Sequence, residues 1–150
     1  MFKNFKNIDK VVFGPGSFDQ LDHILAEKRN EHNRFMVFID DNYFKDKPLA
    51  DRIPAHDQDM VFFEDIDQHE PTTQQIDRLR DTIIEQKGIP SGVIGIGGGS
   101  IMDVAKALSL MVTNEGSSSL YQGLNLVKKP GVYHLGVPTT SGTGAECSMT

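Results

Sequence analysis

Residues 93–106 have the sequence VIGIGGGSIMDVAK, in which a short apolar run, three successive glycines and a helical pattern follow one another. The run at residues 93–96 is typical of a buried strand, and the apolar residues after Ser100 recur at helical spacing. Glycines between a strand and a helix let a ligand approach the backbone, because no Cβ blocks it. The helix adds free N–H groups and the positive end of its dipole. The segment therefore predicts a strand–loop–helix unit with an anion site suited to a pyrophosphate.

A purely structural interpretation of this loop stays open. A tight turn needs only one glycine, and Ser100 can cap the helix while Asp103 completes the cap. Two common phosphate-binding patterns do not match the loop. The Walker sequence needs Gly-Lys-Ser/Thr, but Ile101 and Met102 follow Ser100. The dinucleotide pattern G-x-G-x-x-G can start at Gly95, but Ser100 then occupies its last glycine position.

The rest of the chain alternates strand and helix patterns around this unit. Short apolar runs predict strands at residues 11–13, 35–39, 60–63, 93–96 and 132–137. Helices are expected after Ser17, which would cap the first, between Thr72 and Gly88, and from Ser100. In the second helix, Thr72 and Gln75 can form a capping box, and the predicted buried stripe is Ile76, Leu79, Ile83 and Ile84. This order predicts an α/β, Rossmann-like fold: a parallel sheet with helices on both faces and a binding crevice at the carboxyl ends of its strands.

A second loop follows the last predicted strand. Residues 138–146 have the sequence PTTSGTGAE, which is dense in hydroxyls and glycines. Hydroxyl groups can bond phosphate or ribose oxygens, and glycines allow a tight backbone curl. By itself the segment is an ordinary loop. Paired with the first loop at the same edge of the sheet, it is expected to form the opposite wall of one cleft.

Composition excludes several classes of function. The net charge is −6, which disfavours nucleic-acid binding because phosphate neutralisation needs a basic face. No apolar run approaches the roughly 20 residues that span a bilayer, and no signal peptide is recognisable, so a cytoplasmic location is expected. Cys147 is the only cysteine and is expected to be a small buried side chain. The five histidines lack the spacing of metal ligands.

Residues 97–106 and 138–146, together with the turn at residues 13–16, resemble the iron-containing, metal-dependent alcohol dehydrogenase family. The resemblance implies that residues 1–150 are the nucleotide-binding domain, incomplete at its C-terminal end, of a two-domain dehydroquinate-synthase-like fold. The helical domain, which supplies the ligands for Fe²⁺ or Zn²⁺, would lie beyond Thr150. The metal would polarise an alcohol while a nicotinamide dinucleotide accepts the hydride.

The same resemblance assigns roles to particular residues. The pyrophosphate would meet Gly97, Gly98, Gly99 and Ser100. The hydroxyls of Thr139, Thr140 and Thr143 would lie near the phosphates, the adenine or the adjoining ribose. At the end of its strand, Asp40 would accept hydrogen bonds from the adenine ribose and so favour NAD over NADP, unless Asp40 and Asp41 simply start a turn. Asp103 would lie near the nicotinamide, or be only a cap carboxylate that pairs with Lys106.

The resemblance also implies an activity and a partner. The parent would oxidise an alcohol to an aldehyde or ketone. An early segment expected to be a sheet edge carries Phe2, Phe5, Val11, Val12 and Phe13, which predicts a homodimer through this strand, and the resemblance points the same way. The run at residues 5–14 looks like the branch that oxidises C8 of 3-deoxy-manno-octulosonate, an acidic sugar of lipopolysaccharide. Alternatives are a non-catalytic nucleotide-binding module and a relative of glycerol dehydrogenase or dehydroquinate synthase. The 150-residue chain alone is expected to be inactive.

Overall fold

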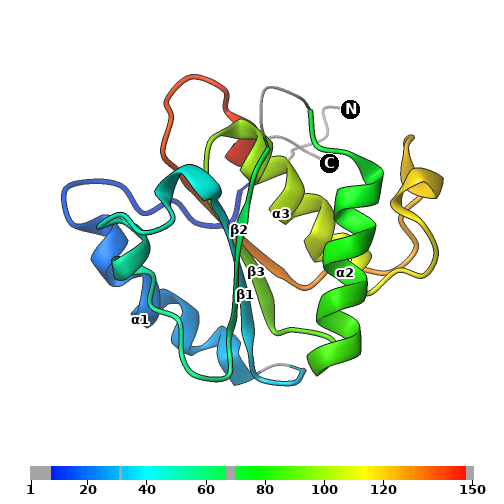
Figure 1. The fold of residues 1–150 in the computed structure, drawn as a ribbon, viewed down its shortest axis with the longest axis horizontal. Helices are drawn as coiled ribbons and strands as arrows, with labels where there is room; N and C mark the ends of the chain where they lie inside the picture. The colour runs from blue at the N-terminus through cyan, green and yellow to red at the C-terminus, as the bar shows by residue number, and fades with distance from the viewer. Residues whose placement is uncertain (1–7, 31, 67–69, 148–150) are drawn as a thin grey trace, which may run out of the picture.

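A computed structural model describes residues 8–30, 32–66 and 70–147. Its centre is a four-stranded, all-parallel sheet with the strand order β2-β1-β3-β4 (Figure 1). The strands are β1 (Met36–Asp41), β2 (Met60–Glu64), β3 (Gly92–Gly97) and β4 (Tyr133–Pro138). The predicted parallel α/β sheet is therefore confirmed. Its carboxyl-terminal edge lies at the top of Figure 1.

Helices cover both faces of the sheet, as the sequence predicts (Figure 1). One face carries α2 (Thr73–Lys87) and α3 (Gly99–Met111), and the other carries α1 (Leu21–Ala26). Successive residues of β1 serve opposite cores, because side chains alternate across a strand: Val37 and Ile39 face α2 and α3, whereas Met36 and Phe38 face α1. Short 3₁₀ turns are η1 (Ser17–Gln20), η2 (Lys28–Asn30), η3 (Asn42–Phe44), η4 (Ala50–Arg52), η5 (Ser118–Tyr121) and η6 (Ala145–Cys147).

The predicted helices form, but their starts differ in detail. Ser17 is the first residue of η1 rather than a cap, because Gly16, with a φ of 78°, makes the turn before it. Thr72 caps α2 by accepting a hydrogen bond from the backbone N–H of Gln75. The side chain of Gln75 donates instead to Glu64, so only half of the expected capping box forms.

The buried stripe of α2 is narrower than predicted. Ile76, Leu79 and Ile83 are buried, but Ile84 is exposed. Helix α3 lies very close to the sheet, since a Cβ on Gly95 would stand 2.7 Å from the Cβ of Ala105. The close approach of α3 to β3 fixes where the helix begins relative to the end of the strand.

The N-terminal strand expected at residues 11–13 is not part of the sheet, which is a correction. An apolar run becomes a strand only with a hydrogen-bonding neighbour. In the described chain these residues are exposed: Val11 is 73% and Phe13 97% exposed. Phe2 and Phe5, which belong to the same prediction, lie outside the described residues.

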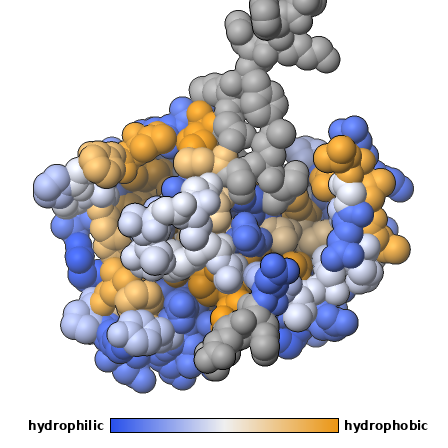
Figure 2. Space-filling view, turned by 90° about the horizontal axis from the view of Figure 1, so that it is seen from above, coloured by the Kyte–Doolittle hydropathy of each residue, from blue (hydrophilic) through white to orange (hydrophobic). Residues whose placement is uncertain are grey.

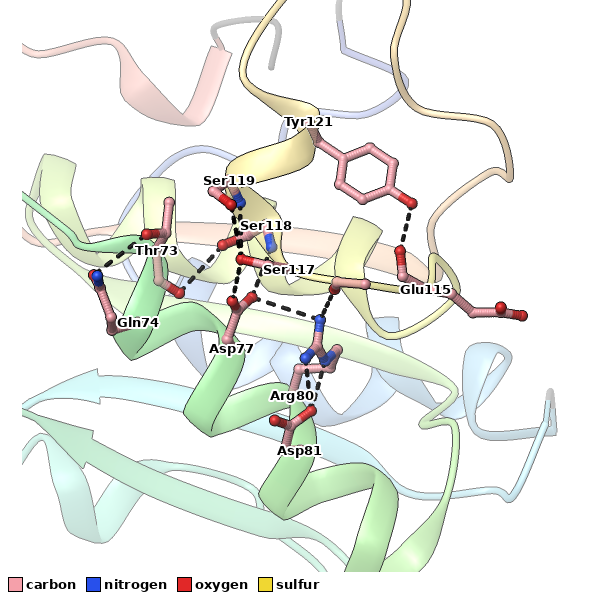
Figure 3. Close-up of polar contacts among 11 residues, drawn as sticks. Thr73, Gln74, Asp77, Arg80, Asp81, Glu115, Ser117, Ser118, Ser119 and Tyr121 are labelled. Carbon is pink, nitrogen blue, oxygen red and sulfur yellow. Dashed lines mark hydrogen bonds and ion pairs between the residues drawn. The ribbon is translucent and has the colours of Figure 1, made fainter.

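The segment that connects α3 to β4 is fastened to α2 by a polar network around Asp77 (Figure 3). The Asp77 carboxylate accepts hydrogen bonds from the Ser117 hydroxyl at 2.6 Å and from the Ser118 backbone N–H at 2.8 Å. Arg80 lies 3.5 Å from the same carboxylate and donates to the carbonyl of Gly116. The network fixes the path of the chain into β4. None of the helices in the described ranges is long and apolar enough to cross a membrane.

Candidate nucleotide-binding site

The two glycine-rich loops lie side by side at the carboxyl ends of neighbouring strands. Gly97 at the end of β3 pairs in register with Pro138 at the end of β4. One residue further on, the backbone N–H of Thr139 donates to the Gly97 carbonyl at 2.9 Å. The structure therefore brings together the two segments that the sequence places on opposite walls of one site.

The three glycines of the first loop have different surroundings. A Cβ on Gly97 would stand 2.8 Å from the Cβ of Ile101, so this glycine is required for packing. On Gly98 it would lie 3.1 Å from Thr140 Oγ1, and on Gly99 it would lie 3.3 Å from Thr143 Cγ2. The bare backbone of residues 98 and 99 thus faces the two threonines. Packing against Ile101 explains Gly97, whereas the close approach of the second loop explains the absence of a Cβ on Gly98 and Gly99.

Helix α3 begins without a side-chain cap. Gly98 is the N-cap residue and has no side chain that could accept from the first N–H groups of the helix. The first helical hydrogen bond runs from the Met102 N–H to the Gly98 carbonyl. Ser100 lies inside the helix, so the alternative interpretation in which it caps α3 does not hold: the helix already begins at Gly99. The first turn therefore keeps free N–H groups and a positive dipole end beside the second loop.

Asp103 and Lys106 lie on the same side of α3, as their spacing predicts. Lys106 Nζ is 3.8 Å from Asp103 Oδ1, and Asp103 is 57% exposed. The ammonium is also buried against the second loop, where it donates to the Ala145 carbonyl at 2.7 Å. The sequence predicted the ion pair but missed this contact, because helical spacing does not show that the lysine turns inward.

At the end of β1 the structure separates two neighbouring aspartates. Asp40 is fully buried, its Oδ1 accepts from the Asp41 N–H at 2.8 Å, and its Oδ2 has no hydrogen-bond partner. Burial raises the pKa of the Asp40 carboxyl to about 6. Asp41 is partly exposed and caps η3 by accepting from the Tyr43 N–H at 2.8 Å.

The expected position of Asp40 at the mouth of the crevice is therefore corrected, because strand alternation turns its side chain into the molecule. Asp41 presents a carboxylate at the surface there. The alternative interpretation, an aspartate that starts a turn, describes Asp41. The ribose-binding role that the sequence assigned to Asp40 stays a prediction.

His134 in β4 is a second, partly buried titratable group near α3. Its Nε2 has no hydrogen-bond partner, and burial together with the nearby Lys106 charge lowers the pKa of His134 to about 4. The imidazole is neutral at ordinary pH. Cys147, expected to be buried, is exposed, because η6 lies at the surface.

No group of three potential metal-ligating side chains occurs in residues 8–30, 32–66 and 70–147. Seen from the carboxyl-terminal edge of the sheet, much of the middle of the surface is pale, the colour of residues with intermediate hydropathy such as glycine, serine and threonine, and hydrophobic patches lie on both sides (Figure 2). The middle of the described edge is thus neither strongly hydrophobic nor strongly hydrophilic.

Comparison with known proteins relates this arrangement to one family. The family model described as iron-containing alcohol dehydrogenase matches residues 9–150. Sulfoacetaldehyde reductase of Bilophila wadsworthia is 32% identical over 143 residues, which cover 93% of this chain and 35% of the relative. NAD-dependent methanol dehydrogenase of Bacillus methanolicus is 48% identical over 54 residues, 36% of this chain and 14% of that protein.

A solved structure extends the comparison to three dimensions. The sulfoacetaldehyde reductase of Bifidobacterium kashiwanohense, solved in complex with NAD⁺, superposes with a TM-score of 0.78 at 25% identity and covers 99% of this chain and 39% of that one. The chain thus spans little more than a third of the length of the two reductases.

Proposed function

Because the chain belongs to the iron-containing alcohol dehydrogenase family, we propose that it is the NAD-binding part of a metal-dependent oxidoreductase that interconverts an alcohol with an aldehyde or ketone. The observation that carries the proposal is the juxtaposition of the two loops. Bare backbone at Gly98 and Gly99 faces the threonines of the second loop, beside the uncapped N-terminus of α3. A pyrophosphate fits this arrangement, since it offers anionic oxygens to N–H and O–H donors.

In this proposal the residues of the chain bind and orient the cofactor. The N–H groups at the start of α3, with Gly97, Gly98, Gly99 and Ser100, hold the pyrophosphate. The hydroxyls of Thr139, Thr140 and Thr143 donate from the opposite side. Asp103, exposed one turn into α3, faces the nicotinamide end. NAD, when bound, supplies a hydride acceptor. The chain thus fixes the position of the dinucleotide while the rest of the protein positions the alcohol.

The metal site belongs elsewhere in the proposed enzyme. The described residues offer no suitable group of ligands, so no catalytic step is assigned to a metal on this chain. We place the ligands, for iron in keeping with the family, beyond Thr150. The 150-residue chain is then expected to bind NAD without turning over an alcohol. Robust metal-dependent turnover of an alcohol by the purified 150-residue chain would contradict this placement of the metal site.

Two anionic substrates are worth testing. The run at residues 5–14 supports 3-deoxy-manno-octulosonate, oxidised at C8 from a primary alcohol to an aldehyde. The match to sulfoacetaldehyde reductase over almost the whole chain supports sulfoacetaldehyde, reduced to the alcohol. A carboxylate or a sulfonate distinguishes both molecules from simple alcohols such as methanol, and this difference can be measured.

The test is an assay of the full-length parent protein. With Fe²⁺ and NAD or NADH, absorbance at the nicotinamide band is followed for 3-deoxy-manno-octulosonate, sulfoacetaldehyde and methanol, and NAD binding is measured separately by calorimetry. We expect NAD binding and turnover of at least one anionic substrate. Failure to bind NAD would overturn the proposal. NAD binding without turnover of any alcohol or aldehyde would favour the alternative, a non-catalytic nucleotide-binding module.

A further inference from the structure

Lys106 is a buried cation that joins α3 to the far end of the second loop. Its side chain is only 9% exposed, although that of its ion-pair partner Asp103 is largely in solvent. The ammonium donates to the Ala145 carbonyl, which lies in η6 at the end of residues 139–144. The bond therefore connects two elements that are 39 residues apart in the sequence.

Burial of this ammonium needs an explanation other than the ion pair. Lysine is almost never fully buried, because removing the charge from water is costly unless good partners replace the water. A pair at spacing i,i+3 forms equally well on the exposed side of a helix, where Asp103 already lies. The inward-turned ammonium instead reaches the second loop, where it donates to the Ala145 carbonyl.

Residues 139–144 of the loop are exposed, and the space around two of its glycines is open. Gly142 and Gly144 have φ values of 114° and 65°, and a Cβ on either would meet nothing within 4 Å. At its near end the loop is joined to the first loop by the hydrogen bond from Thr139 to Gly97. Lys106 provides a charged hydrogen bond at its far end. Between these two points, Thr140 and Thr143 are held against Gly98 and Gly99.

We propose that Lys106 is a positioning residue: by holding the Ala145 carbonyl, it keeps the hydroxyls of residues 139–143 preorganised over the N-terminus of α3 for the phosphates of NAD. The inference rests on the proposed NAD site but goes beyond it, because Lys106 acts through the loop rather than by touching the cofactor. Without the bond, the loop samples other conformations and NAD binding must order it again.

The experiment uses the full-length protein and three variants. Lys106→Met removes the charge and the donor, Lys106→Arg keeps both, and Lys129→Met removes an exposed lysine that is 61% accessible and pairs with Glu115. Dissociation constants for NAD, KM for NAD and kcat are measured, together with hydrogen exchange of the amides of residues 139–147 without cofactor.

Loss of one charged hydrogen bond predicts that Lys106→Met raises the Kd and KM for NAD roughly tenfold or more. At saturating NAD, kcat should change far less, and loop amides should exchange faster. Lys106→Arg should restore most of the affinity, and Lys129→Met should behave as wild type. A folded Lys106→Met protein with wild-type Kd and wild-type loop exchange would overturn the inference.

Two further outcomes are also decisive. If Lys106→Met does not fold, Lys106→Gln, which keeps a shorter neutral donor, replaces it with the same expectations for Kd and exchange. If the wild type itself does not bind NAD, the proposed function fails, and with it the role in cofactor binding. The exchange comparison then still shows whether Lys106 holds the loop, so the two failures can be told apart.

Discussion

Thr140 lies directly opposite Gly98, with its Oγ1 3.1 Å from the position that a Cβ on residue 98 would occupy. The backbone of Gly98 itself is in an extended conformation, with φ of −79° and ψ of −174°, which any residue can adopt. The glycine is therefore required for the space in front of the backbone and not for the path of the chain. At Gly97, by contrast, the space that a Cβ would occupy is already filled from within the domain, by the side chain of Ile101.

Gly98→Val is expected to abolish NAD binding while the fold survives. The branched side chain would fill the space between the loops, and we expect the Kd for NAD to rise at least about tenfold, which corresponds to about 1.4 kcal/mol. Gly97→Ala is the counterpart: overpacking against Ile101 should cost on the order of 1–3 kcal/mol of stability. Calorimetry with NAD and thermal unfolding of both variants measure the two effects. Unchanged NAD affinity in Gly98→Val would show that the loop is only a turn.

The parent is expected to prefer NAD to NADP by tenfold or more. A carboxylate at the end of β1 can accept hydrogen bonds from the ribose hydroxyls, worth roughly 1.5–3 kcal/mol, and would repel a 2′-phosphate. Because Asp40 is buried and Asp41 is partly exposed, Asp41→Gly should lower the NAD/NADP ratio more than Asp40→Asn does. Titration of each variant with both cofactors measures the ratio. If only the change at residue 40 alters it, the original assignment to Asp40 holds.

The titrations of Asp40 and His134 should have opposite effects on the free energy of unfolding as the pH falls. Burial raises the pKa of Asp40 to about 6, so its stabilising contribution is fully present below pH 3.8 and is lost as the pH rises through 6. Burial and the Lys106 charge lower the pKa of His134 to about 4, so its contribution is present above pH 6.5 and is lost as the pH falls through 4. Each amounts to about 3 kcal/mol, and between pH 6 and 4 they largely cancel.

Replacing either Asp40 or His134 alone should expose the pH dependence contributed by the other residue. Asp40→Asn should make the chain lose stability, relative to wild type, as the pH falls from 6.5 to 4, and His134→Gln should make it gain stability over the same interval. Asp57→Asn, a change at an exposed turn, is the control. Urea unfolding at several pH values gives the slopes. If the free energy of unfolding varies with pH in Asp40→Asn and in His134→Gln as it does in wild type, neither group titrates as described.

Homodimerisation of the parent is expected through the N-terminal segment. The exposed side chains of Val11 and Phe13 belong to backbone outside the four-stranded sheet, and such unpaired apolar segments associate readily. Phe13→Ser should shift the sedimentation equilibrium towards monomer. Leu124→Ser is the matched control, because Leu124 is similarly exposed but lies in the connection between α3 and β4. A wild-type monomer at micromolar concentration, or an effect of the control alone, would contradict this.

The sequence predicts the strands best where a continuous apolar run is buried on both faces of the sheet. The apolar runs of β1 and β3 are buried on both faces, and both strands form as expected. The run at residues 11–13 is similarly apolar but has no neighbour in the sheet, and hydrophobicity alone does not reveal that difference. Asp40 and Asp41 differ by one position, yet strand alternation buries one and exposes the other.

Parts of the candidate site depend on contacts between distant segments, which periodicity cannot show. The glycine and threonine loops were both recognised, because two unusual sequences follow two strands. The Lys106–Ala145 contact was not, because nothing in the spacing of α3 indicates which helical face the second loop covers. The start of α3 at Gly99 was also missed, since a run of glycines hides where a helix begins.

The register of the sheet has a consequence for how the chain folds. Met36 pairs with Gly92, and Gly92 in turn pairs with Tyr133, so β1 and β4 meet only through a strand that lies between them in the sequence. Every strand pairing closes a long stretch of chain and none is a hairpin. Such non-local pairing slows folding. During synthesis, the edge of β1 that pairs with β3 stays unpaired until residues 92–97 have left the ribosome, and unpaired strand edges are prone to aggregation.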